Sequence, residues 1–162
     1  MLTKNVQEAL NDQLNLEFAS SYLYLKMAIY FEEVNLVGFA KWMRVQAAEE
    51  YAHALKIFEY IIQVNGKIKL KSIDITNETY TSPLLVFEKT LEHELQVTIS
   101  IHKLVELSIA EKDYASNNFL QWFVQEQVEE ESNITYLVER LRMIGDNKSG
   151  LLYLDKEMAK RV

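Results

Sequence analysis

The sequence contains no cysteine, one proline and only four glycines among 162 residues. Without cysteine, a disulfide framework, an iron–sulfur cluster, a zinc ribbon and a thiolate nucleophile are all excluded. Turns depend on glycine and proline, so their scarcity argues against a β-rich fold and favours a few long helices. The first ten residues, MLTKNVQEAL, lack the apolar segment of a signal peptide, and no apolar run is long enough to span a bilayer. We therefore expect a cytoplasmic protein that has no membrane partner.

Positive charge is also in short supply, and the formal net charge is −7 at pH 7. Such a surface is a poor partner for nucleic acid and attracts cations. Hydrophobic residues make up 49% of the chain, so disorder is not expected. The length suits a single domain, residues 1–162, that is large enough to bury a core.

Apolar residues recur at helical spacing in four long segments and one short one. Ser82 is expected to cap the third helix ahead of Pro83, and Asn65 with Gly66 to end the second. The expected bundle covers about residues 4–145. Its helices are expected at about 4–33, 39–64, 83–108 and 114–145, and the short fifth helix at about 151–160.

The lengths of the connections predict the topology. The links near residues 34–36 and 112–113 are short, which makes helices one and two, and helices three and four, antiparallel hairpins. The link over residues 67–81 can extend to about 50 Å, whereas a 28-residue helix is about 42 Å long. We therefore expect an all-α four-helix bundle with one long crossover, in which helices two and three are parallel.

Polar residues interrupt the apolar stripes in a repeated pattern. In each copy a glutamate precedes, by 33 residues, a pair of polar residues spaced i, i+3, and a shift of 77 residues carries one copy onto the other. The i, i+3 spacing places both members of a pair on one helix face. The two copies are Glu17, Glu50 and His53, and Glu94, Gln127 and Glu130.

The four glutamates of this pattern are candidate metal ligands. A buried carboxylate without a partner is costly, and no lysine or arginine lies on the same stripes. Their combined charge of −4 balances two divalent cations, and His53 adds a nitrogen ligand. Carboxylates with imidazole suit iron or manganese better than copper or structural zinc. The alternative from the residues alone is a structural bundle in which each glutamate reaches water at the edge of its stripe.

The pattern Glu17…Glu50-x-x-His53 resembles the ferritin-like di-iron proteins. The resemblance to prokaryotic non-haem ferritin covers nearly the whole chain, through NLEFASSYLY, QAAEEYAHALKIFEYI, FLQWFVQEQVEEE and GLLYLDKE. The second copy reads Gln127-x-x-Glu130 instead of repeating Glu-x-x-His, as in an asymmetric ferritin centre. Tyr51 stands where bacterioferritins carry a haem-ligating methionine, so no haem is expected, and the absence of cysteine excludes the iron modules of rubrerythrins.

The resemblance implies a ligand set for two irons per subunit. Glu17, Glu50 and His53 would hold the first iron. Glu50 would bridge to the second iron, which Glu94 and Glu130 complete. The irons would be oxidised from Fe(II) by O₂ or peroxide at a centre inside each subunit.

Further roles also follow from the resemblance. Gln127 would hydrogen-bond beside the irons more than ligate them. Tyr24, two turns from Glu17, would hydrogen-bond a ligand or supply an electron, whereas spacing alone predicts a core tyrosine. His93, His102 and three methionines are not expected at the site: we expect the histidines at the surface or an interface, and Met27, Met43 and Met143 in the core. A possible third iron site, sharing Glu130, would use residues that otherwise form a solvated acidic face: Glu49, Glu126 and Glu129.

The function implied by the resemblance is iron storage and detoxification, with ferroxidase activity. Fe(III) would be stored as mineral inside a hollow homo-oligomer of 24 subunits. The alternative is a di-iron oxidase or peroxidase that turns over a substrate and stores no iron. The short fifth helix, and the lack of any domain for a redox partner, weigh against that alternative.

Overall fold

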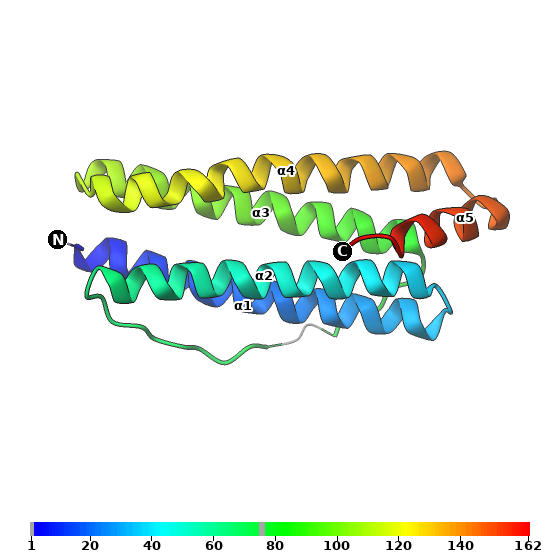
Figure 1. The fold of residues 1–162 in the computed structure, drawn as a ribbon, viewed down its shortest axis with the longest axis horizontal. Helices are drawn as coiled ribbons and strands as arrows, with labels where there is room; N and C mark the ends of the chain where they lie inside the picture. Colours follow the sequence, from blue (N-terminus) through cyan, green and yellow to red (C-terminus); the bar gives the residue numbers. More distant parts are fainter. Residues whose placement is uncertain (1, 75–76) are drawn as a thin grey trace.

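The computed structural model describes residues 2–74 and 77–162, which form five helices and no strand. Four long helices lie side by side as a bundle, and the short fifth helix turns back from the end of α4 (Figure 1). This all-α arrangement confirms the expected fold. The helices are α1 (Lys4–Glu33), α2 (Val37–Gln63), α3 (Pro83–Ala110), α4 (Tyr114–Ile144) and α5 (Lys148–Met158).

The ends of the long helices have local causes. The Ser82 hydroxyl accepts a hydrogen bond from a backbone N–H in the first turn of α3, and Pro83 is the first helical residue. The Asp113 carboxylate caps α4 in the same way. Asn35 and Lys112 adopt positive φ angles of 60° and 57°, which turn the chain within the two hairpins. The hairpins α1–α2 and α3–α4 therefore agree with the expected topology.

The crossover from α2 to α3 runs along the bundle, so that α2 and α3 are parallel (Figure 1). Two asparagines that lie one turn apart on α1 hold the first half of the crossover in an extended conformation. Asn11 donates to the Lys67 carbonyl at 2.9 Å and accepts from the Lys69 N–H at 2.6 Å. Asn15 donates to the Lys69 carbonyl at 2.8 Å and accepts from the Lys71 N–H at 2.7 Å. Residues 75–76 of the expected crossover lie outside the described residues.

The buried apolar side chains form two clusters with a polar layer between them. On α1, Leu14 belongs to one cluster and Tyr24 to the other, and on α3 Val97 and Phe87 divide in the same way. On every long helix, the change from one apolar cluster to the other occurs at the candidate ligands. The polar layer therefore crosses the middle of the bundle.

α5 packs against the start of α2. A Cβ atom on Gly38 would lie 1.7 Å from the Asp155 carbonyl oxygen, so only glycine allows this approach. The Asp155 carboxylate accepts a hydrogen bond from the Phe39 N–H at 3.0 Å, and Lys41 Nζ donates to the Ala159 carbonyl at 2.8 Å. These contacts fix the segment after α5 beside α2.

Two expectations about particular positions were wrong. α5 begins at Lys148 instead of about Leu151, because the Asn147 side chain accepts from the Gly150 N–H at 3.0 Å and caps the helix earlier. Met143 is 86% exposed, whereas Met27 and Met43 are buried in the core as expected. No helix in the described part of the chain is long and apolar enough to cross a membrane.

Candidate metal centre

The polar layer draws side chains from all four long helices. α1 supplies Glu17, α2 supplies Glu50 and His53, α3 supplies Glu94, and α4 supplies Gln127 and Glu130. Each of these residues is at most 7% exposed. All six predicted residues therefore lie within the buried layer between the two apolar clusters.

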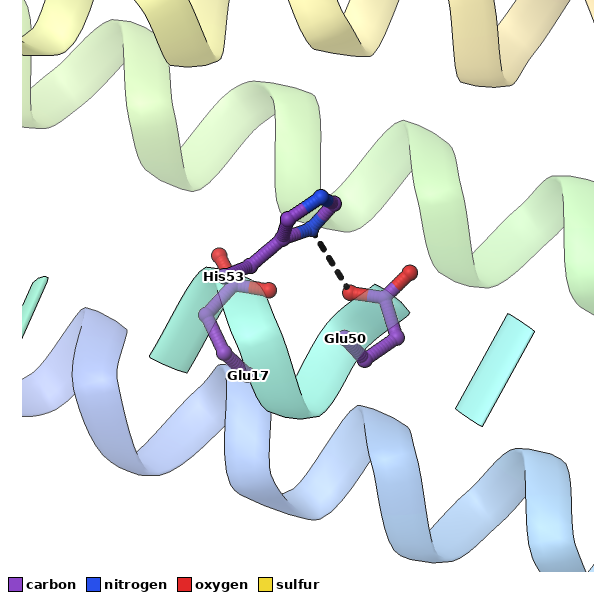
Figure 2. Close-up of side chains that lie close together, drawn as sticks. All are labelled: Glu17, Glu50 and His53. Carbon is purple, nitrogen blue, oxygen red and sulfur yellow. Dashed lines mark ion pairs between the residues drawn. The ribbon is translucent and has the colours of Figure 1, made fainter. Parts of the chain in front are cut away.

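Three of them form the tightest group. Glu17, Glu50 and His53 each offer one ligand atom within 4.8 Å of the others, and Figure 2 shows Glu17 of α1 close to Glu50 and His53 of α2. His53 Nδ1 lies 3.4 Å from Glu50 Oε2. Glu17 Oε1 accepts from Gln13 Nε2 at 2.7 Å, but its buried Oε2 has no hydrogen-bond partner among the described residues. A cation held by this group would satisfy that oxygen.

Glu94 and Glu130 do not join that trio, because other side chains hold them. The Tyr24 hydroxyl donates to Glu94 Oε1, and Gln127 Nε2 donates to Glu94 Oε2 at 3.1 Å. Glu130 Oε2 accepts from Gln46 Nε2 at 3.0 Å. Amide and hydroxyl donors therefore orient both carboxylates within the buried layer.

Two amides of the site were missed by sequence reasoning. Gln46 donates to both Glu50, at 2.9 Å, and Glu130, and so ties α2 to α4 across the layer. Gln13 supports Glu17. Each lies four residues before the glutamate it binds on the same helix, and this i, i+4 spacing is the signal that could have identified them.

Crowding of carboxyl groups shifts their pKa values. Burial, and then the charge of Glu50, raise the pKa of Glu94 to about 8 and that of Glu130 to about 7. The same two causes raise the pKa of Glu17 well above its usual value. Burial also acts on Glu50, but its hydrogen bond and ion pair with His53 outweigh burial and lower its pKa. The metal-free layer therefore carries protons that entering cations would displace.

The outer side of His53 faces an opening. His53 Nε2 lies 3.8 Å from Glu126 Oε1, and the Trp122 ring contacts the imidazole edge-on at 5.3 Å between centroids. Lys56 Nζ lies 4.3 Å above the centre of the Trp122 ring. A cavity of about 410 Å³ opens here, and its lining includes Glu49, His53, Lys56, Glu59 and Trp122.

The residues expected at a third site lie near this opening to different degrees. Glu126 approaches His53, and Glu49 lies on the cavity wall, where its carboxylate pairs with Arg161. Burial is the largest cause of a raised pKa at Glu49. Glu129 is exposed on α4. These three do not form a cluster as tight as the trio within the described residues.

His93 differs from its expected place at the surface or an interface. It is half-buried, its Nε2 lies 2.7 Å from the Ser20 hydroxyl, and its ring contacts Tyr24 edge-on at 5.8 Å. Burial lowers the pKa of His93. The His93 side chain points away from Glu94 and toward α1, where Ser20 is its partner. The spacing of residues on α3 alone cannot reveal this contact. His102 is exposed, as expected.

Comparisons with known proteins identify relatives of this chain. Residues 7–144 match the family described as ferritin-like domain. The chain is 40% identical to a bacterial non-heme ferritin of Bacteroides fragilis, over 99% of this chain and 100% of the relative. It is 38% identical to one from Campylobacter jejuni, over 96% of this chain and 93% of the relative. Crystal structures of an open-pore ferritin from the archaeon Archaeoglobus fulgidus match all of both chains, with a TM-score of 0.99 and 48% identity.

Proposed function

This chain belongs to the ferritin family of iron-storage proteins, and we propose that its buried polar layer is a dinuclear centre that oxidises Fe(II). The observation that carries the proposal is the convergence of Glu17, Glu50 and His53 around an unpartnered carboxylate oxygen. A cation is the natural partner for such a group of buried ligands.

The proposed ligand set follows the sequence prediction. Glu17, Glu50 and His53 hold one iron, and Glu50, Glu94 and Glu130 hold the other, with Gln127 as a hydrogen-bond donor to Glu94. The 3.1 Å contact between Gln127 and Glu94 supports that role. Glu50 is the proposed bridge, and its position near the other carboxylates supports this role, since its charge raises the pKa of Glu17, Glu94 and Glu130.

The proposed reaction uses two Fe(II) ions as substrate. Each ion gives up one electron, and the two electrons with two protons reduce O₂ to H₂O₂. With peroxide as oxidant, the two electrons and two protons reduce H₂O₂ to two molecules of water. The carboxylates stabilise the charge that builds on the iron as Fe(III) forms. Carboxyl protons leave as Fe(II) binds, so the layer reaches the reaction already ionised.

Storage requires an enclosure, and we propose a hollow shell of 24 identical subunits around the mineral. Exposed apolar side chains along α1 support contacts between subunits, since Tyr22, Leu25 and Ile29 are 47%, 42% and 59% exposed. The cytoplasmic location stays a prediction. The expected absence of haem also stays a prediction, and a Soret band in the purified protein would contradict it.

A third cation site beside the pair is also proposed, formed by Glu49, Glu126 and Glu129 with a shared Glu130. The approach of Glu126 to His53 Nε2 at 3.8 Å and the open cavity beside it support this position. Because Glu49 and Glu129 are more exposed than the buried trio, the third site is the weaker one.

A titration with Zn(II), which does not change oxidation state, tests the ligand proposal. We expect the metal-free protein to bind two Zn(II) ions per chain tightly and a third more weakly, as measured by isothermal titration calorimetry. Glu17→Gln should remove at least one tight site. Fewer than two tight ions per chain in the unmodified protein would contradict the dinuclear assignment.

Replacing Tyr24 by phenylalanine should slow Fe(II) oxidation by roughly tenfold without abolishing it. The substitution removes the hydroxyl that donates to Glu94, so this ligand loses an orienting contact while the packing of the ring remains. Tyr22→Phe is the matched control, since Tyr22 lies on the same helix and is 47% exposed. Equal initial rates of Fe(II) oxidation for the two variants would show that the Tyr24 hydroxyl has no role in the reaction.

A further inference from the structure

Arg161, just after α5, reaches across to the wall of the cavity beside His53. Its Nη2 donates to Glu49 Oε2, and its guanidinium lies 4.1 Å from the centre of the Trp42 ring. The exposed fractions of the two side chains in this ion pair are 21% for Arg161 and 41% for Glu49. An arginine that stacks on an aromatic face and binds a carboxylate is held in one orientation.

The position of Arg161 is set by the docking of α5. Gly38 allows the Asp155 backbone to approach α2, and Lys41 binds the Ala159 carbonyl two residues before Arg161. The Arg161 N–H donates to the Met158 carbonyl at 3.3 Å. The guanidinium is therefore presented to Glu49 by a well-anchored segment.

The guanidinium also retains unused bonding capacity. Its Nη1 is buried and has no hydrogen-bond partner among the described residues. Glu49 is thus the principal compensation for a partly desolvated positive charge, and losing that contact is costly. A cation that binds Glu49 must break this pair or remain close to a like charge.

We propose that Arg161 competes with the third cation for Glu49, so that the dinuclear centre fills before the third site. The inference rests on the third site proposed above and adds a residue that sets its affinity. Arg161 is a positioning residue for Glu49, since it acts through that carboxylate. When no third cation is present, the ion pair holds Glu49 against the segment after α5.

Replacing Arg161 by glutamine tests the competition. The variant removes the charge but keeps a hydrogen-bonding side chain, and we expect the third class of Zn(II) sites to bind roughly tenfold more tightly by calorimetry. Arg161→Lys keeps the charge and should stay close to the unmodified protein. Lys160→Gln is the matched control, because it removes a neighbouring charge that pairs with Glu157 at 2.7 Å, away from Glu49.

A double variant, Arg161→Gln with Glu49→Gln, should lose the gain, since the competition acts through Glu49. A third class that binds equally in Arg161→Gln and Lys160→Gln would overturn the inference while leaving the third site in place. Two tight sites with no third class in Arg161→Gln would overturn both the inference and the third site. Fewer than two tight Zn(II) sites per chain in the unmodified protein would instead contradict the dinuclear proposal.

Discussion

Replacing Glu50 by alanine should lower the initial rate of Fe(II) oxidation by more than about a hundredfold, beyond the usual effect of losing a supporting contact to a ligand. Glu50 pairs with His53 at 3.4 Å and accepts from Gln46 at 2.9 Å. As the proposed bridge it serves both irons, so its loss should disable the centre as a unit. Stopped-flow absorbance of the Fe(III) product measures the rate.

The matched control for this variant is Glu106→Ala, which removes a carboxylate from the exposed face of α3. The control should oxidise Fe(II) at the unmodified rate, because it leaves the buried layer intact. A Glu50→Ala variant that keeps its helical circular dichroism and oxidises Fe(II) as fast as the control would rule out Glu50 as the bridge.

Replacing Glu94 by glutamine should make the metal-free protein more stable at pH 8 and nearly unchanged at pH 5. Burial and the Glu50 charge raise the folded-state pKa of Glu94 from 4.5 to about 8. The folded state therefore binds more protons than the unfolded state between these values, and its stability falls as pH rises through this window. Removing the titrating group removes that loss, on the order of 4 kcal/mol at pH 8.

Glu130 and Glu50 do not reverse this fall in stability with rising pH. Glu130, with its pKa raised to about 7, contributes a loss in the same direction. Glu50 has a lowered pKa, so its contribution changes below 4.5, outside the window. Unfolding curves at pH 5, 6, 7 and 8, with chelator and at one protein concentration, measure the difference.

Glu106→Gln, which removes an exposed carboxylate of α3, is the control for the pH series. The stability difference between Glu94→Gln and the unmodified protein should grow steadily from pH 5 to pH 8. A difference that is constant across the series would mean that Glu94 does not hold a proton in the metal-free centre.

The long helices could be predicted because their signals are local. Ser82 with Pro83 begins α3 by capping, and the apolar spacing predicted the buried stripes. The start of α5 was predicted about three residues too late, because the Asn147 side chain caps the helix ahead of Lys148. Met143 lies two residues after the buried Leu141, which turns it to the opposite face of α4, and it is therefore exposed.

The candidate ligands could be predicted because polar residues at stripe positions are conspicuous in sequence. The contacts that orient them were not predictable in the same way. Gln46 binds Glu130 across 84 positions of sequence, and Arg161 binds Glu49 across 112. Such pairs depend on how α2, α4 and the segment after α5 pack, which no periodicity on one helix describes.

Aerobic loading of the metal-free protein with Fe(II), followed by size exclusion, tests whether this protein stores iron. The quantity to measure is the number of iron atoms per chain in the protein peak. Iron storage predicts a large particle that holds tens of irons or more per chain. Two or three irons per chain in a small oligomer would contradict storage and favour a di-iron oxidase or peroxidase.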